Sequence, residues 1–489
     1  MKKETTGFNK NYFSSLNFVI CGIFILSFSS TLLAQSPVFR AGASTANITP
    51  FLGLGIVGNF VEPPATYIHD ELFARSLVLD DGNSKLVFVI VDNVGVGNEV
   101  FVAAKRLILE ETKIPPDHII MSSTHTHSAT SAGGLGIKRR GWNEGDSLDE
   151  YQRFLARRIA DGVRVALNNL EPARIGWGAG STPQHLFNRR WKLKNPVVNP
   201  FGVMEPVMMN PGVGNPNLLE PAGTTDPDVS FISIQSLEGR PIALLANYSL
   251  HYVGGVPAGD ISADYYGVFA NRIRELLNGD RDNIPFVGMM SNGTSGDVNN
   301  INVRGPVEKY PSYAKMRIVA DDVAREVLRV YQAVKYQDWV PLKAAKSELN
   351  LHVRKPGSQM LADAQAVLQK PATEKLPHPL TRIYAERIIQ LKEWPDSINI
   401  ILQTFRIGDL GIAAIPFEVF AETGLEIKAK SPFKPSFTIE LANGYYGYLP
   451  TPEQHKLGGY ETWFSTNRVE TEASRKIVAE LMKLFNRLQ

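Results

Sequence analysis

The sequence has 489 residues, of which 44% are hydrophobic and 20% charged, and this composition excludes a disordered, fibrous or disulfide-scaffold protein. Lys and Arg number 51 against 49 Asp and Glu, and the first 34 residues supply the whole excess. The remainder is neutral, which argues against a basic surface for nucleic acid or anionic lipid.

The N-terminus has the pattern of a secretory signal peptide. Scattered lysines precede the apolar run 18–28, and Ala34 could precede a cleavage site. The run is too short to span a bilayer as a helix. The single cysteine, Cys21, lies inside it, so a mature chain 35–489 would fold without disulfides. We expect a secreted or periplasmic bacterial protein without a transmembrane span, and its oligomeric state is left open.

The next elements predict a βαβ unit. Residues 85–91 form a continuous apolar run, residues 100–111 show helical apolar spacing, and residues 119–121 form a short buried strand. Such a unit implies parallel strands. We therefore expect an α/β fold with mixed, mostly parallel sheets flanked by helices, and a site at the carboxyl ends of strands.

The remaining elements follow in chain order, with no internal repeat in the sequence. Apolar patterning predicts strands and helices at 148–170 (helix), 173–177 (strand), 229–235 and 242–250 (hairpin), 265–277 (helix), 285–290 (strand), 313–334, 358–369 and 380–393 (helices), 398–406, 411–415 and 437–441 (strands), and 470–488 (helix). The segment 195–227 is rich in Pro, Asn and Gly and predicts a long surface loop that shapes a substrate cleft.

Three histidines follow predicted strands. His125 and His127 come shortly after the strand ending at Met121, and two positions apart on an extended segment they project to the same side. They suit a shared metal, or a ligand and a base, unless both are exposed loop residues. His251 lies at the end of an apolar strand, where it is either a buried core residue or a metal ligand. Three histidines at strand ends favour zinc.

Two further segments carry polar residues after strands. Residues 290–300 are small and polar, so their backbone either approaches a ligand closely or forms a tight turn. They lack the lysine of a phosphate loop and the spacing of a nucleophile elbow. Glu418 follows another strand, as a ligand or as the cap of a helix, and Tyr445, Tyr446 and Tyr448 follow the strand 437–441.

Taken in order, these segments resemble the catalytic domain of the neutral ceramidase family, from about Phe39 to the C-terminus. The resemblance rests on the matching motifs Ala41-Gly42-Ala43 with Asn47-Ile48-Thr49-Pro50, Ile68-His69-Asp70, Ala74-Arg75-Ser76, Val91-Asp92, Thr124 to Ser128, Asn188-Arg189, Asn247 to His251, Gly296-Asp297-Val298, Pro416-Phe417-Glu418, Tyr445 to Thr451 and Gly459-Tyr460-Glu461. Such an ordered set is more specific than any one motif.

The resemblance implies a zinc ion and its ligands. The ligands of the family fall on His125, His251, Glu418 and Tyr448. Its other site residues fall on His127, Arg189 and Tyr460, which would orient and polarise the amide carbonyl of a substrate. Hydrolytic zinc lowers the pKa of bound water toward ~7 and polarises carbonyl groups.

Two departures from the family bear on the substrate. Asn299 stands where ceramide-cleaving members carry the serine of GDVSPN, and we expect no counterpart of their C-terminal β-sandwich domain. Asparagine is not an acyl-accepting nucleophile. We therefore expect zinc-bound water to attack directly, with Asn299 and Arg189 donating to the oxyanion. A competing mechanism makes Ser295 the nucleophile.

The resemblance as a whole implies a zinc-dependent hydrolase that cleaves an N-acyl, ceramide-like amide or an ester. Its partner would be a lipid-like acylated molecule such as a sphingolipid, and no nucleic acid. Two alternatives are a zinc hydrolase acting on a carbohydrate conjugate and a catalytically silent protein that binds a lipid or glycan.

Overall fold

The computed structural model describes residues 38–58, 60–130, 132, 148–279 and 286–489, which belong to one compact unit, 37–489. The predicted signal peptide and Cys21 lie outside the described residues. Among the residues described, no helix is both long and apolar enough to cross a membrane.

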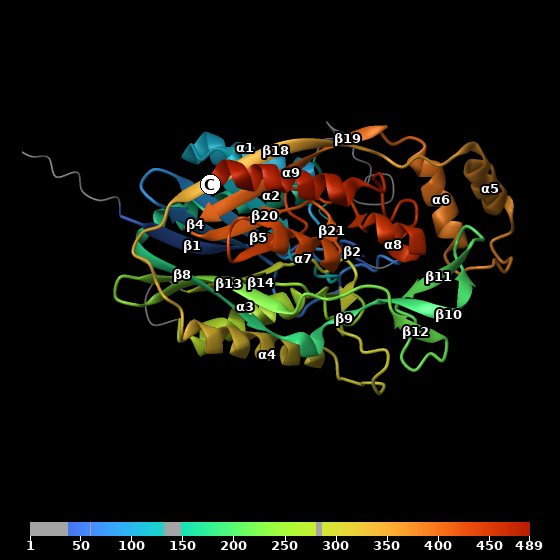
Figure 1. The fold of residues 1–489 in the computed structure, drawn as a ribbon, viewed down its shortest axis with the longest axis horizontal. Coiled ribbons are helices and arrows are strands. Elements are labelled where there is room, and N and C mark those ends of the chain that lie inside the picture. The colour runs from blue at the N-terminus through green and yellow to red at the C-terminus, as the bar shows by residue number, and fades with distance from the viewer. Residues whose placement is uncertain (1–37, 59, 131, 133–147, 280–285) are drawn as a thin grey trace, which may run out of the picture. The chain divides into compact units, whose positions relative to one another are not determined.

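One arrangement of strands and helices occurs three times along the chain (Figure 1). In each unit three strands pair antiparallel, a helix follows, a fourth strand pairs parallel with the third, and another helix closes the unit. The sequence shows no repeat, so the similarity lies in topology rather than in residues.

The units have the following bounds. The first has β1 (Arg40–Asn47), β4 (Phe73–Asp80), β5 (Lys85–Val91), α1 (Asn98–Thr112), β6 (Ile119–Ser123) and α2 (Glu150–Asn168). The second has β8 (Glu171–Ser181), β13 (Asp228–Ser236), β14 (Pro241–Tyr248), α3 (Asp264–Leu276), β16 (Val287–Asn292) and α4 (Ala314–Tyr331). The third has β18 (Leu342–His352), β19 (Ser397–Ile407), β20 (Leu410–Ala414), α7 (Ala421–Lys430), β22 (Ser436–Ile439) and α9 (Ala473–Leu488).

Shorter elements lie between these. They are β2 (Ile56–Val57), β3 (Tyr67–Ile68), β7 (Ala129–Thr130), β9 (Phe187–Asn188), β10 (Arg190–Val198), β11 (Met204–Met209), β12 (Leu218–Pro221), β15 (Asp260–Ile261), β17 (Val298–Asn299), α5 (Ser358–Gln369), α6 (Thr381–Leu391), β21 (Glu418–Val419), β23 (Tyr448–Leu449) and α8 (Pro452–Leu457).

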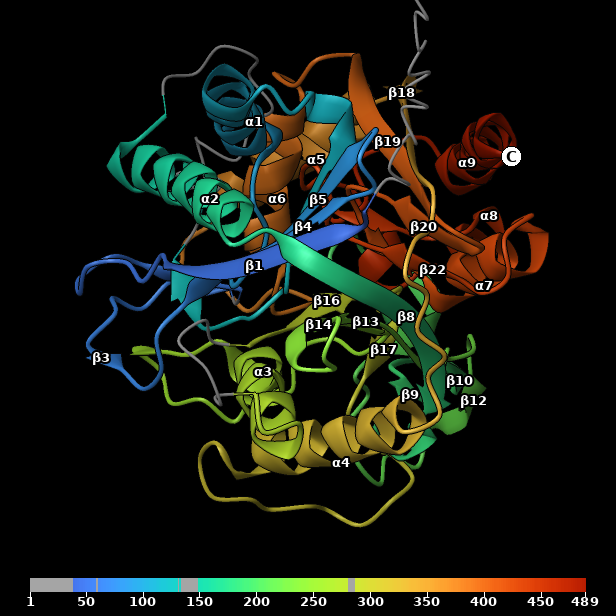
Figure 2. The same cartoon turned by 90° about the vertical axis from the view of Figure 1, so that its left-hand side faces the viewer.

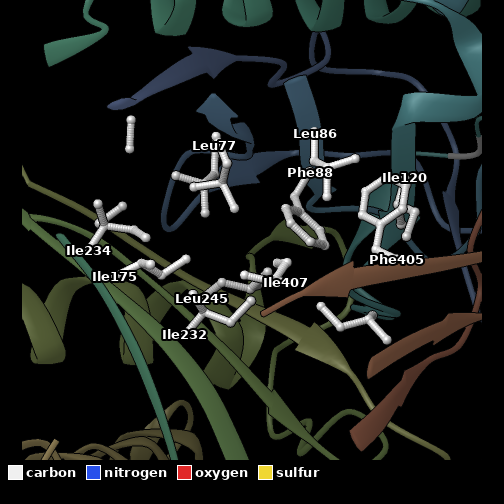
Figure 3. Packing of buried hydrophobic residues seen from close by; sticks show 14 of the residues in the cluster. Leu77, Leu86, Phe88, Ile120, Ile175, Ile232, Ile234, Leu245, Phe405 and Ile407 are labelled. Atoms are coloured by element: carbon white, nitrogen blue, oxygen red, sulfur yellow. The ribbon is translucent and has the colours of Figure 1, made fainter. Parts of the chain in front are cut away.

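The main core lies between two sheets. The first two units join through a short β1–β8 ladder into an eight-stranded sheet, and the third unit forms a four-stranded sheet. In Figure 3, Phe88 of the larger sheet lies beside Phe405 of the smaller one, and their rings meet edge to face at 5.3 Å. Both side chains are buried, as are the residues around them.

Helices cover the outer faces of the sheets, as Figure 2 shows for α1 and α2 over β4 and β5. The helices α3 and α4 pack on β13 and β14, and α7 and α9 pack on the smaller sheet. Helix α2 begins with a capping box, in which Asp149 and Gln152 each bond the backbone N–H of the other. Its apolar stripe then faces β1 and β4.

The predicted α/β class, with mixed sheets flanked by helices, is confirmed. The βαβ unit β5–α1–β6 and the hairpin β13–β14 form as expected. The balance of pairings differs from the expected predominance of parallel strands: in the eight-stranded sheet the pairs at the two ends are parallel and the pairs between them are antiparallel. The antiparallel strands β1 and β4 of the first unit were not predicted.

The prediction of a long loop at 195–227 is wrong, because strands β10, β11 and β12 form a three-stranded sheet within and beside this segment. The turns between them hold most of the Pro, Asn and Gly residues that suggested a loop. Most side chains of these strands are exposed or half-buried, with Trp191, Leu193 and Val207 as buried anchors. The strands therefore lack an apolar period that could reveal them.

Candidate metal centre

The site lies where strands of all three units end, as predicted for the carboxyl ends of parallel strands. In each unit the residues after the third strand meet those after the fourth. The meeting pairs are Val94 with His125 in the first unit, His251 with Ser295 in the second, and Val419 with Glu440 in the third. Backbone bonds join the units, such as Gly296 N–H to Val419 O and Glu440 N–H to Asn292 O.

The three histidines converge through their Nε2 atoms. The Nε2 of His125 lies 3.0 Å from that of His251 and 3.1 Å from that of His127. Burial lowers the pKa of both His127 and His251 well below the ordinary value, and the charge of Arg189 adds to the effect, so both rings are neutral at pH 7.

Backbone carbonyls set the tautomers of two of these rings. The Nδ1 of His125 lies 2.6 Å from Val94 O, and the Nδ1 of His251 lies 3.3 Å from Ser295 O. Since a carbonyl oxygen only accepts, each Nδ1 carries the proton. Each Nε2 therefore presents a lone pair to the other histidine.

Glu418 completes the cluster. Its Oε2 lies 3.3 Å from the Nε2 of His125 and 3.8 Å from that of His251, and it is buried without a hydrogen-bond partner. Its Oε1 accepts a hydrogen bond from the Tyr445 hydroxyl at 2.7 Å. Burial raises the pKa of this carboxyl, but the polar groups around it, Tyr448 and Arg189 among them, outweigh burial, and the pKa falls below its ordinary value.

This donor set fits a tetrahedral cation such as zinc. Lone pairs that face each other at 3.0 Å repel unless a cation lies between them, and the orphaned Oε2 of Glu418 lacks a partner at the same place. Zinc bonds of about 2.0–2.2 Å place tetrahedral ligand atoms roughly 3.3–3.6 Å apart. The observed separations between the donor atoms bracket that range.

Tyr448 lies beside Glu418 because β21 and β23 pair in parallel with these two residues in register. Its hydroxyl interacts with the Glu418 carboxylate and the Arg189 guanidinium, and its ring lies 5.2 Å from the guanidinium carbon. The predicted ligands His125, His251, Glu418 and Tyr448 are thus brought together. The structure adds His127 to the convergent nitrogen atoms.

A buried arginine pair places positive charge next to the histidines. Arg189 donates to one oxygen of Glu461 at 2.9 Å and Arg190 to the other at 2.6 Å, so one carboxylate balances two guanidiniums. The Nη1 of Arg189 lies 3.3 Å from the Nε2 of His251, and its Nη2 is buried without a partner. Arg189 therefore has a free donor where an oxyanion could be stabilised.

Aromatic rings form one wall of the site. Tyr252 stacks on His127 with a centroid distance of 3.7 Å and fixes the plane of that ring. Tyr460 meets Tyr448 edge to face at 5.7 Å and Phe60 at 6.3 Å. Burial raises the pKa of Tyr460 to about 12, so its hydroxyl keeps its proton at neutral pH.

Asn299 lies in β17, which pairs with β9, and β9 ends directly before Arg189. Its Nδ2 donates to Asn210 Oδ1 at 2.6 Å and its Oδ1 accepts from Ile301 N–H. Among the described residues no hydrogen bond joins Asn299 to the three histidines. The second N–H of its amide has no hydrogen-bond partner among the described residues.

Three contributors were not predicted: Tyr445 as the partner of Glu418, Tyr252 as the ring that stacks on His127, and Glu440. Tyr252 directly follows His251, and Tyr445 lies in the tyrosine-rich loop noted in the sequence. Glu440 is a lone acidic residue at the end of an apolar strand, which is the signal that also marked Glu418.

Solved structures of ceramidases share this fold. The crystal structure of neutral ceramidase from Pseudomonas aeruginosa matches with a TM-score of 0.68 and 18% identity, over 92% of this chain and 74% of that one. A ceramidase complexed with C2 matches with a TM-score of 0.66 and 17% identity, over 92% and 75% of the two chains. No family profile matches the sequence. The chain thus has the neutral ceramidase fold, as the sequence resemblance predicted.

Proposed function

We propose that this protein is an exported zinc-dependent hydrolase of N-acyl amide bonds, with a ceramide-like lipid as the first substrate class to test. The observation that carries the proposal is the buried convergence of imidazole lone pairs and the orphaned Glu418 oxygen. The shared fold with neutral ceramidases supports the substrate class. Residues 1–34 would direct export and be removed.

The proposed ligands are His125, His251, Glu418 and Tyr448, with His127 beside them. When bound, zinc supplies a Lewis acid for the carbonyl and lowers the pKa of a water molecule. Backbone and tyrosine contacts hold these donor atoms in place, which would keep a bound ion at a fixed position relative to the substrate.

The surrounding residues supply hydrogen-bond donors and a proton acceptor. The free Nη2 of Arg189, the protonated hydroxyl of Tyr460 and the remaining N–H of Asn299 can donate to the carbonyl oxygen as negative charge develops on it. Neutral His127, fixed by Tyr252, can accept a proton through Nε2 when that atom is not bound to the ion. The complete donor set argues against a silent binding protein.

The test combines metal analysis with a substrate panel. We expect about one zinc per purified chain and hydrolysis of N-acyl sphingosine, with N-acyl amino acids and acylated sugars as the other arms. His251→Ala should lose both zinc and turnover, whereas His352→Ala, at an exposed position outside the site, should retain both. An active protein without zinc, or full activity in His251→Ala, would refute the proposal. Cleavage of acylated sugars alone would change the proposed substrate class from a lipid to a carbohydrate conjugate.

A further inference from the structure

Glu440 is a carboxylate buried to 0% exposure behind the metal centre. No Lys or Arg among the described residues forms an ion pair with it. Burial raises its pKa well above the ordinary value, and hydrogen bonds from Ser295 and Val419 oppose that rise. A buried acidic group without a cation needs donors that hold its charge.

The donors come from the two neighbouring strand ends. The Oε2 of Glu440 accepts the backbone N–H of Val419 at 2.6 Å and that of Ser295 at 3.3 Å. Its Oε1 accepts the hydroxyl of Ser295 at 2.7 Å. The carboxylate therefore joins the segment that carries Glu418 to the segment that backs His251.

Ser295 connects Glu440 to the far edge of the His251 ring. Its Oγ lies 3.4 Å, and its carbonyl oxygen 3.3 Å, from the Nδ1 of His251. With its proton donated to Glu440, the hydroxyl presents only lone pairs to that nitrogen. The Nδ1 then keeps its proton, and the Nε2 keeps the lone pair that faces the cluster.

We propose that Glu440 is a positioning residue that acts through Ser295 to fix the orientation of His251 and to support the tautomer that the Ser295 carbonyl sets, and through the Val419 N–H to hold Glu418. This role rests on the metal site proposed above. Glu440 occupies in the third unit the place that His125 and Ser295 occupy in the first and second. Partners of this kind behind metal ligands change metal affinity by 10–100-fold when removed.

The same geometry separates Ser295 from the reaction. Its hydroxyl approaches the Nδ1 edge of His251, while Arg189, His125 and Glu418 approach the Nε2 edge. The imidazole ring thus lies between the Ser295 oxygen and the converging donor atoms. Ser295 serves as a relay between Glu440 and His251 and not as a nucleophile.

The experiment measures zinc affinity by chelator competition on metal-free protein, with Ser295→Ala, Glu440→Gln and the double variant. Each single variant should bind zinc at least tenfold more weakly than the wild type. Because both residues act through one chain of contacts, the double variant should bind no more weakly than the weaker single variant. The cobalt-loaded variants should show altered visible absorption, since the ligand geometry changes. Ser436→Ala is the control, because it removes a buried hydroxyl without a partner from the strand that leads to Glu440.

The outcomes separate this inference from the proposed function. Wild-type protein that binds no zinc rejects both. Wild-type protein that binds zinc, with folded Ser295→Ala and Glu440→Gln within twofold of it and unchanged cobalt spectra, overturns only the positioning role. An acyl group trapped on Ser295 would also overturn it. Circular dichroism establishes folding, and Ser295→Ala removes a single oxygen, so this arm stays decisive if Glu440→Gln unfolds.

Discussion

At His125 the backbone takes a left-handed conformation, with φ of 77°, which costs a residue with a Cβ roughly 1–3 kcal/mol. Two contacts hold it there: its N–H donates to Asn93 O at 2.8 Å, and its Nδ1 donates to Val94 O. The turn lets His125 and His127 both aim Nε2 at one point. Strain of this kind is typical of functional sites, and here it orients a proposed metal ligand.

Lys105 on α1 should make stability depend on pH. Its side chain is buried, donates to Asn443 Oδ1 at 2.8 Å, and has a pKa lowered to about 7, first by burial and then by Lys346. In the unfolded chain a lysine titrates near ~10.4. Between these values the unfolded state binds more protons, so stability should rise with pH by up to about 1.4 kcal/mol per unit.

Urea unfolding from about pH 7 to about pH 9 checks this linkage. The rise should be smaller in Lys105→Met than in the wild type, while Lys375→Met, at an exposed position, should keep the wild-type slope. Equal slopes in all three proteins would show that Lys105 is charged in the folded state.

At the scale of elements, the loop after β16 approaches β21 so closely that a side chain does not fit. A Cβ added at Gly296 would lie 2.6 Å from Glu418 O and 2.8 Å from its carbonyl carbon. Gly296→Ala should push the loop away from β21, lowering the free energy of unfolding by about 1–3 kcal/mol. It should also weaken zinc binding, because Glu418 moves with the strand.

Denaturant unfolding and zinc competition measure the two effects. Gly55→Ala is the control, since its Cβ would meet only Glu62, at 3.8 Å. A Gly296→Ala protein with wild-type stability and wild-type zinc affinity would mean that the loop adapts without moving Glu418.

Elements with strong apolar patterns were predictable from the sequence: β5 and α5 have the expected bounds, and other predicted helices differ by a few residues at their ends. Strand β1 was not, because its sequence RAGASTAN has small residues in place of an apolar alternation. Packing against helix α2 explains why these residues are small. A Cβ at Gly42 would lie 2.2 Å from Ala166 O of α2, a constraint that exists only once α2 is docked.

The residues of the site likewise fall into those that could be predicted from the sequence and those that could not. His125, His127, His251 and Glu418 were identified because histidines and a carboxylate at strand ends form a recognisable pattern and match an ordered set of family motifs. Glu440 belongs to no motif. Its importance depends on the Ser295 hydroxyl of the second unit and on the Val419 N–H of an earlier segment of its own unit, and these groups meet it only in the folded chain.

At the scale of the whole molecule, metal should stabilise the fold. The proposed ligands come from all three units, and an ion that binds only the folded state adds about 2.7 kcal/mol at a free concentration of 100 times its Kd. Thermal unfolding with and without zinc tests this. Chelator should lower the Tm of the wild type and of His352→Ala but leave that of His251→Ala unchanged; a wild-type Tm insensitive to chelator would contradict it.

Completion of the proposed metal site also depends on how the three units dock. Each unit contributes polar residues from the ends of its strands, and the donor atoms form a single cluster only when all three units are docked. Because the main core lies between the sheet of the first two units and that of the third, a chain with one unit misdocked would lose part of its core together with part of the donor cluster. Retention of the proposed ion would thus report that all three units are docked, through His125 and His251, which are 126 positions apart in the sequence.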